Sequence, residues 1–79
     1  MELSYDPTVD AAYVMLVDSV GDGEAATQSD ILPLLNGAEV IFDYDEAGFL
    51  LGIEILQADK VFRPEMLARA PLPALGGEG

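Results

Sequence analysis

The sequence predicts an α+β protein that is mostly β: an antiparallel β-meander of four to five strands with one short C-terminal helix. Apolar side chains recur every second residue more often than every 3.6 residues along most of the chain. Asp-Pro, Asn-Gly and Gly-rich segments separate the apolar runs and are typical of tight turns. The segment with helical start and stop signals lies near the end, at residues 63–70.

The chain begins with a predicted hairpin. Leu3 and Tyr5 share one face of a short strand. A turn follows, because Pro7 presets its own φ and the Asp6 carboxylate can accept a hydrogen bond from the backbone two residues on. Residues 11–17 are apolar on both faces, which is typical of a strand in the centre of a sheet.

The middle of the chain is less regular. Residues 18–23 predict a turn, and residues 24–29 predict a strand, with a short helix over residues 24–28 as the alternative. Pro33 cannot donate to a ladder, so residues 31–35 belong in a loop or on a sheet edge. We expect the aliphatic side chains around this proline to pack under the domain's own core; the alternative is an interface with a partner chain. They are Ile31, Leu32, Leu34 and Leu35.

The best-defined hairpin follows a strong turn signal at Asn36-Gly37. Its first strand carries Val40, Phe42 and Tyr44 on one face, and an acidic turn ends at Gly48. The second strand is expected to supply four alternating core residues: Phe49, Leu51, Ile53 and Ile55.

The opposite face of that second strand is mixed, and it includes Gly52 and Glu54. A glycine inside a strand weakens it by roughly 0.5–1 kcal/mol relative to alanine, so Gly52 needs a reason, such as a bulge or the close approach of another backbone. We therefore expect Gly52 and Glu54 to contribute to the partner interface.

The helix over residues 63–70 has suitable ends. Pro64 fits its first turn, Glu65 lies at the positive end of the helix dipole and Arg69 at the negative end. Two prolines then end the helix. We expect a single domain over residues 1–70 and a flexible Pro/Gly-rich tail over residues 71–79.

Size and composition restrict the kinds of site that this chain can hold. A domain of 79 residues buries only about 60% of its unfolded surface. No cysteine or histidine is present, which removes disulfides, thiolate nucleophiles and the commonest metal ligands. The composition is 51% apolar, and the helix is too short to cover a sheet. These features predict a homodimer and no cofactor.

The charge is strongly acidic and unevenly distributed. The net charge is −12, and the basic residues are Lys60, Arg63 and Arg69, so residues 1–59 hold thirteen acids and no base. Such a surface repels nucleic acid and anionic membranes and favours a basic protein partner. The alternative is that the acids only keep an apolar protein in solution. Since no apolar run of membrane-spanning length and no basic leader is present, we expect a cytoplasmic location.

Two motifs resemble a known family. The first is Tyr5-Asp6-Pro7 followed by Asp10-Ala-Ala-Tyr13, and the second is the acidic turn leading into Gly52-Ile-Glu-Ile-Leu56 with Ala58 beyond it. Over residues 3 to about 60 the chain resembles the small prokaryotic family catalogued as domain of unknown function 2283. The segment over residues 30–37 is longer than the family's usual link. Members are uncharacterised, so the resemblance carries over no catalytic residues. Some are encoded beside genes for toxin-like proteins, which implies a protein partner.

The acidic hairpin overlaps a calcium-loop template. Asp43, Asp45 and Glu54 match its acidic positions, although Ala47 stands where the template has a ligand. Calcium needs six to eight oxygens on a curled loop. Glu54 instead lies mid-strand, roughly 17–20 Å from the turn along an extended chain. We therefore interpret these residues as parts of a hairpin, and keep cation binding between Asp43 and Glu54 as an alternative function.

A third hypothesis is a small hydrolase with paired carboxylates, drawn from Asp6, Asp10, Asp43 and Glu54. With no histidine and no phosphate-binding loop, we do not expect an enzyme. Tyrosines 5, 13 and 44 could form a stacking platform for bases, but the acidic field opposes nucleic acid. The sequence favours a non-catalytic acidic interaction module that neutralises a basic protein.

Overall fold

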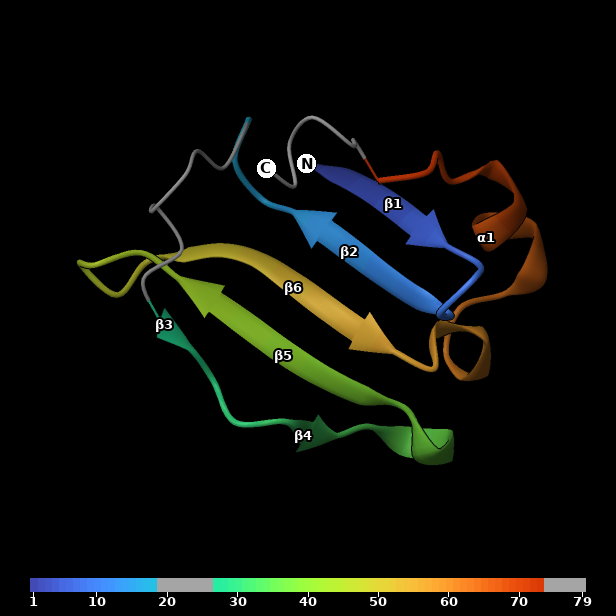
Figure 1. Cartoon of the computed structure of the whole chain (residues 1–79), viewed down its shortest axis with the longest axis horizontal. Coiled ribbons are helices and arrows are strands. Elements are labelled where there is room, and N and C mark those ends of the chain that lie inside the picture. Colours follow the sequence, from blue (N-terminus) through green and yellow to red (C-terminus); the bar gives the residue numbers. More distant parts are fainter. Residues whose placement is uncertain (19–26, 74–79) are drawn as a thin grey trace.

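The computed structural model describes residues 1–18 and 27–73, and it shows one antiparallel sheet with a small helical end (Figure 1). The strands are β1 (Glu2–Asp6), β2 (Ala11–Met15), β3 (Thr27–Gln28), β4 (Leu32–Pro33), β5 (Glu39–Tyr44) and β6 (Leu50–Leu56). Two 3-10 turns, η1 (Leu35–Gly37) and η2 (Ala58–Lys60), accompany the helix α1 (Pro64–Arg69). The predicted class, antiparallel and mostly β with one short helix, is confirmed.

The strand order is β1-β2-β6-β5-β3, with β4 also paired to β5. In the described part of the chain the sheet has six strands, instead of the four to five expected, because the edge beside β5 is divided into two short pieces. In addition, β6 returns between β2 and β5 (Figure 1), so the order is not sequential as in a simple meander. The period of two along each strand is the same for both arrangements, which is why the sequence pattern did not separate them.

The register sorts side chains onto two different faces, because successive residues of a strand point to opposite sides. One face, called here the apolar face, carries two rows that cross the sheet. The first row is Leu3, Val14, Ile53 and Phe42, and the second is Tyr5, Ala12, Ile55, Val40 and Leu32. The other face, called here the acidic face, carries the carboxylates of Glu2, Asp6, Glu39, Asp43 and Glu54.

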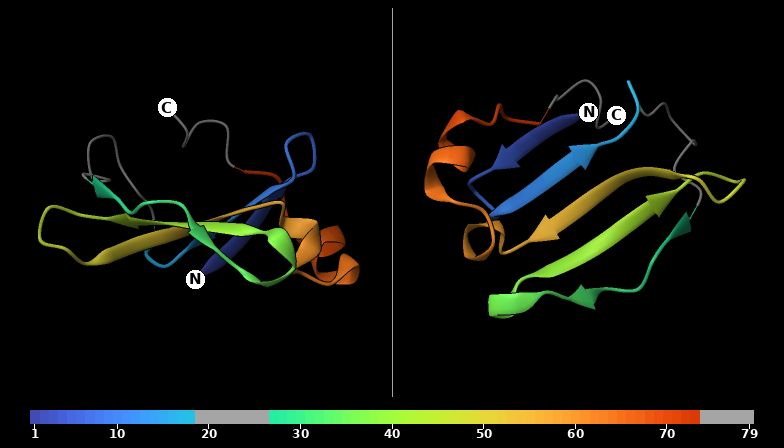
Figure 2. Two further views of the ribbon diagram at one scale, coloured as in Figure 1. Left: turned by 90° about the horizontal axis from the view of Figure 1, so that it is seen from below. Right: turned by 180° about the vertical axis from the view of Figure 1, so that it is seen from behind.

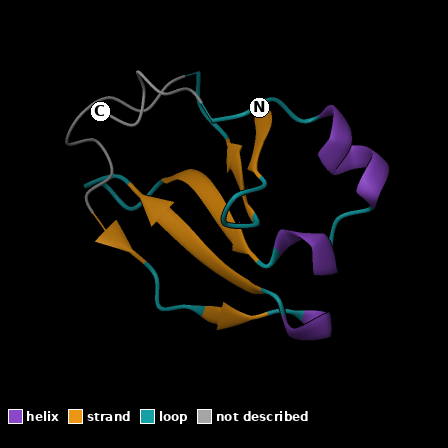
Figure 3. Cartoon of the chain, turned by 45° about the vertical axis from the view of Figure 1, so that its right-hand side comes forward, coloured by secondary structure: helices purple, strands orange, loops and turns teal. Residues whose placement is uncertain are grey.

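The helical end covers only part of the apolar face. Leu67 of α1 and Ala58 of η2 join a core cluster with Ala12, Val40 and Ile55. Seen from below in Figure 2, the strands form a single layer with α1 beyond one end, and Figure 3 shows the helical segments gathered there. The first apolar row is therefore only half-buried, and no large side chain of the described residues is fully buried.

The predicted ends of the helix are confirmed. Pro64 occupies the first turn of α1 together with Glu65, and Arg69 lies in the last turn. Ala70 leaves the helix with an extended backbone (φ −73°, ψ 133°), and its N–H bonds the Leu67 carbonyl. Residues 71–73 still contact the domain, because the Tyr5 N–H donates to the Pro71 carbonyl at 2.9 Å.

The aliphatic segment at residues 31–35 does not pack under the core as expected. Its side chains are exposed by 37 to 85%: Ile31, Leu32, Leu34 and Leu35. Pro33 is held on the sheet edge opposite Glu39. Asn36 and Gly37 then adopt positive φ, of 65° and 86°, and reverse the chain directly into β5. This immediate reversal leaves no length of chain to pass beneath the sheet, so the segment stays at the edge.

Phe49 is also not the core residue that the alternation predicted; its side chain is 71% exposed. The Asp45 carboxylate accepts hydrogen bonds from the N–H groups of Ala47 and Phe49, both at 2.9 Å, which keeps Phe49 in the turn. Beyond it, Tyr44 pairs with Leu50 and Asp43 with Gly52, so a bulge at Leu51 shifts the register. The alternation therefore continues into the core only from Leu51 onward.

The turn predicted at residues 18–23, most of the strand or helix predicted over residues 24–29, and the tail beyond residue 73 lie largely or entirely outside the described residues. Within residues 1–18 and 27–73, none of the helices has the length and apolar character needed to span a membrane.

Candidate functional site

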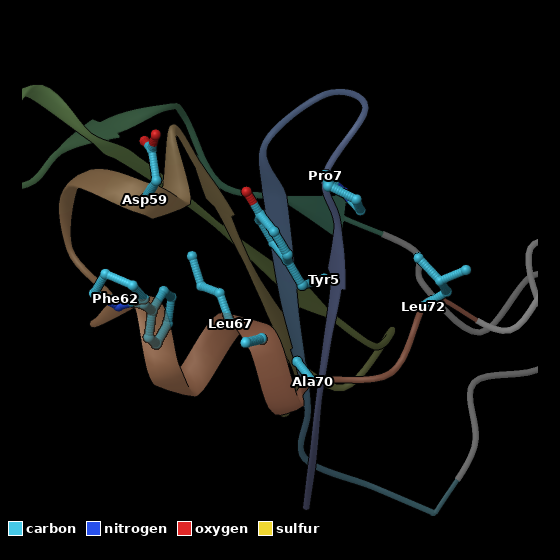
Figure 4. A pocket seen from close by; sticks show the side chains of 9 residues that line it. Tyr5, Pro7, Asp59, Phe62, Leu67, Ala70 and Leu72 are labelled. Atoms are coloured by element: carbon cyan, nitrogen blue, oxygen red, sulfur yellow. The ribbon is translucent and has the colours of Figure 1, made fainter.

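A hollow of about 480 Å³ lies between the end of β1, η2 and α1. Its volume is in the range of small-ligand sites, roughly 300–1,000 Å³. Figure 4 shows Tyr5 at the centre, with Phe62 and Leu67 on one side and Pro7 and Leu72 on the other. The polar contributions come from the Tyr5 hydroxyl and the Asp59 carboxylate. The hollow is thus an apolar surface with one acidic end.

Two backbone contacts hold the walls of this hollow together. The Ala58 N–H donates to the Asp10 carbonyl at 3.0 Å, which joins η2 to the β1–β2 turn. The hydrogen bond from Tyr5 to Pro71 joins β1 to the chain that leaves α1. Gln57 adopts a left-handed conformation (φ 54°), which turns the chain sharply out of β6 and towards Asp10. The site therefore depends on residues from both ends of the domain.

Asp10 is the centre of the polar end. Its Oδ1 accepts a hydrogen bond from the Tyr5 hydroxyl at 2.7 Å and another from the Asp59 N–H at 3.0 Å. Asp10 itself has positive φ (54°), a conformation that aspartate and asparagine tolerate better than most residues. One carboxylate oxygen thus connects β1, the β1–β2 turn and η2.

This network shifts three pKa values. The hydrogen bond to Asp10 is the largest reason why the pKa of Tyr5 rises to about 12. Burial raises the pKa of Asp10, but hydrogen bonds from Tyr5 and Asp59 outweigh it, and the net pKa is lowered. The pKa of Asp59 is raised, first by its carboxyl hydrogen bond to Asp10 and then by burial and by repulsion from the same carboxylate. Relative to a free carboxyl, the network thus favours the ionised form of Asp10 and the protonated form of Asp59.

We expect the Asp59→Asn variant to have a higher Tm than the wild type at pH 7. A raised folded pKa means that the contribution of Asp59 to stability is complete below its unfolded pKa and is lost as pH rises through the folded pKa. At pH 7 the ionised carboxylate is therefore unfavourable, and the gain should disappear near pH 3, where Asp59 is protonated. Circular dichroism melting measures both values.

The control for this prediction is Asp30→Asn, which removes one exposed charge between β3 and β4 and leaves the network unchanged. An equal gain in Tm from Asp30→Asn at pH 7 would show that the effect is only the reduction of a net charge of −12.

A second polar network crosses the acidic face. The Tyr13 hydroxyl of β2 donates to Asp43 Oδ2 of β5 at 2.9 Å, and Gln28 Nε2 of β3 donates to Asp43 Oδ1 at 3.0 Å. The Tyr13 ring must cross β6 to reach Asp43, and it does so over Gly52, where a Cβ atom would overlap the hydroxyl and the ring. Burial, followed by the bond to Asp43, raises the pKa of Tyr13 to about 12. The Tyr13 ring of the same chain therefore explains why residue 52 is a glycine.

Two of the three calcium candidates are engaged in other contacts. Both oxygens of Asp43 accept hydrogen bonds from side chains of the sheet, and Asp45 closes the turn. Glu54 lies opposite Ile41, further along β6. Among the described residues, no group of three or more acidic side chains is arranged to hold a metal ion.

The four acids proposed as a catalytic cluster fall into two pairs: Asp6 and Asp10 lie at the β1–β2 turn, and Asp43 and Glu54 lie near Tyr13 on β5 and β6. Asp6 accepts hydrogen bonds from the N–H and the hydroxyl of Thr8, at 3.0 and 2.6 Å, which confirms the predicted turn. Asp10 is paired instead with Asp59, a residue that the sequence did not indicate. The sequence offered one signal for Asp59: it directly follows Ala58, the last residue of the second motif. Contact between the two motifs would bring Asp59 close to Asp10.

Both family motifs meet at this hollow: Tyr5 and Asp10 come from the first, and Ala58 ends the second. A family model described as "Protein of unknown function (DUF2283)" matches residues 2–58. No curated protein and no solved structure matches the chain. Because the matched residues make up well over half of the sequence, the chain belongs to the DUF2283 family of proteins of unknown function.

Proposed function

We propose that this domain is a non-catalytic interaction module whose acidic face binds a basic protein. The observation that carries this proposal is the separation of charge in the fold. All three basic residues lie in η2, in α1 or between them, whereas the strands β1 to β6 contain no lysine or arginine. The charged side chains of the strands are therefore all negative, and the basic side chains lie at the helical end.

The acidic face offers carboxylates spread over three strands. Glu2 is exposed, and Asp6, Glu39 and Glu54 are half-exposed, while Asp43 is buried in the network with Tyr13. Carboxylates fixed on a sheet favour lysine and arginine side chains that approach from a second protein, and they raise the rate of encounter. Such binding weakens with salt, because exposed charges are screened beyond about 8–10 Å.

Two other functions have less support. The pair of Asp10 and Asp59 beside the hollow, with opposite shifts in pKa, favours acid–base hydrolysis as a second candidate. Cation binding between Asp43 and Glu54 has only the sequence template in its favour, because Asp43 already accepts two hydrogen bonds.

The proposal is tested with a synthetic 20-residue oligolysine as the basic probe, by titration calorimetry in 50 mM and 500 mM salt. We expect the triple variant Glu2→Gln, Glu39→Gln, Glu54→Gln to lose about tenfold in affinity at low salt. The matched control Asp30→Asn, Glu46→Gln, Glu65→Gln removes the same number of charges from exposed positions outside the strands. Its affinity should change by less than about threefold. An equal loss in both variants would show that only net charge matters and would overturn the assignment to this face.

A further inference from the structure

Over residues 1–18 and 27–73, the sheet has no second layer across its apolar face. A sheet with one apolar face is normally buried against another layer of helices or strands. Here α1 has six residues and lies beyond one end of the strands (Figure 2). The first apolar row stays half-buried: Leu3, Val14, Phe42 and Ile53. A domain of this size has little core to spare, so a half-buried row of this kind favours a partner.

We propose that a second copy of this chain supplies the missing layer by packing its apolar face against the same face of the first copy. This inference concerns the face opposite to the one that we propose for a basic protein, and neither depends on the other.

The distribution of charge favours a second copy over a basic partner on this face. Neither apolar row contains a charged residue, and the strand carboxylates at Glu2, Asp6, Glu39, Asp43 and Glu54 all lie on the other side. Lysines or arginines of a partner would therefore lose water without meeting a carboxylate. Two copies with a net charge of −12 each repel one another through most surfaces. Packing apolar face on apolar face keeps both sets of strand carboxylates outward and far apart.

Pairing through the sheet edges is less favourable. On one edge, Pro33 of β4 has no N–H to donate to another strand. On the other edge, the outward N–H of Tyr5 in β1 is already bonded to Pro71. Because both edges are blocked in part, the face is the better surface for a symmetric contact.

The size of the face is sufficient. The longer principal extents of the chain are 34 and 27 Å, and a standard-size interface takes about 800 Å² from each partner. Two sheets packed face to face lie about 10 Å apart. The core cluster places Leu67 of α1 on the apolar side at one end. A two-fold axis within the interface and perpendicular to the strands would therefore place the two helical ends at opposite ends of the dimer.

The first experiment is sedimentation equilibrium of the full chain between 10 and 100 μM. We expect twice the monomer mass of 8.4 kDa. The variant Val14→Lys should weaken the dimer at least about tenfold, because it brings two lysines into an apolar contact. The matched control is Met15→Lys, since Met15 is the next residue of β2, is also half-buried and points to the acidic face. A wild-type chain with the monomer mass, or equal dissociation of both variants, would overturn the proposal.

The Val14→Lys chain could fail to fold, so a second measurement uses conservative changes. The sequence has no cysteine, and Val14→Cys or Met15→Cys therefore introduces a single thiol. With a short bismaleimide reagent at 50 μM, we expect Val14→Cys to give a covalent dimer at least about tenfold faster than Met15→Cys. Equal rates at the two positions would contradict packing through the apolar face.

Discussion

The Gly52→Ala variant is expected to lose about 3 kcal/mol of unfolding free energy, a large part of the stability of so small a domain. The added methyl group would overlap the hydroxyl and ring of Tyr13, which cross β6 at this point. The ring can avoid the methyl group only by leaving Asp43, and this would remove a hydrogen bond from a carboxylate whose residue is 8% exposed. Overpacking and an unsatisfied buried polar group each typically account for about 1–3 kcal/mol.

Urea denaturation of four chains tests this prediction: the wild type, Gly52→Ala, Tyr13→Ala and the double variant. In the Tyr13→Ala background, the alanine at position 52 has no ring to meet, and we expect it to raise the stability by about 0.5–1 kcal/mol, the usual gain of alanine over glycine in a strand. Additive effects in the double variant would mean that the glycine is required for some other reason than the tyrosine.

The Asp10→Ala variant is expected to lose about 3–4 kcal/mol. It removes the acceptor for both the Tyr5 hydroxyl and the Asp59 N–H, and each such hydrogen bond contributes about 1 kcal/mol net. It also places alanine at a φ of 54°, where a left-handed residue with a Cβ atom costs about 1–2 kcal/mol. Urea denaturation at pH 7 measures the loss.

Asp10→Asn is the matched control, because asparagine tolerates the left-handed conformation and keeps a side-chain oxygen that accepts hydrogen bonds. We expect it to lose less than half as much as Asp10→Ala. The lowered pKa of Asp10 further predicts that the difference between the wild type and Asp10→Asn shrinks as pH falls through the folded pKa of this carboxyl. If the alanine and asparagine variants were equally stable, the backbone conformation and the acceptor would both be unimportant.

Local patterns predicted the turns and strands well where one residue controls the backbone. Asp6 and Asp45 bond to the chain two residues on, and Asn36 and Gly37 adopt the positive φ that their types allow. The pattern failed at Phe49, since the same Asp45 turn extends one residue further and the bulge at Leu51 then changes the alternation. A turn of this length and a bulge depend on the pairing of β5 with β6, which the alternation alone does not show.

The candidate site was predictable only in part. Tyr5, Asp6 and Asp10 stood out as members of a motif, but their partners Ala58 and Asp59 come from the far side of β6, 49 residues beyond Asp10 in the case of Asp59. Asp43 stood out as a ligand for a cation, whereas it accepts hydrogen bonds from Tyr13 and Gln28. The residue types were informative, but their contacts were decided by strand order.

The sequence by itself determined the antiparallel class, the short helix, the family and the acidic charge, because these follow from local period, turn chemistry, motif and composition. Only the tertiary structure decided that β6 lies between β2 and β5. That placement carries the Tyr13 ring over Gly52, joins Asp10 to Asp59, and separates an apolar face from an acidic one. The physical reason is that strand neighbours and register are set by packing across the whole sheet, and no period within a single strand contains that information.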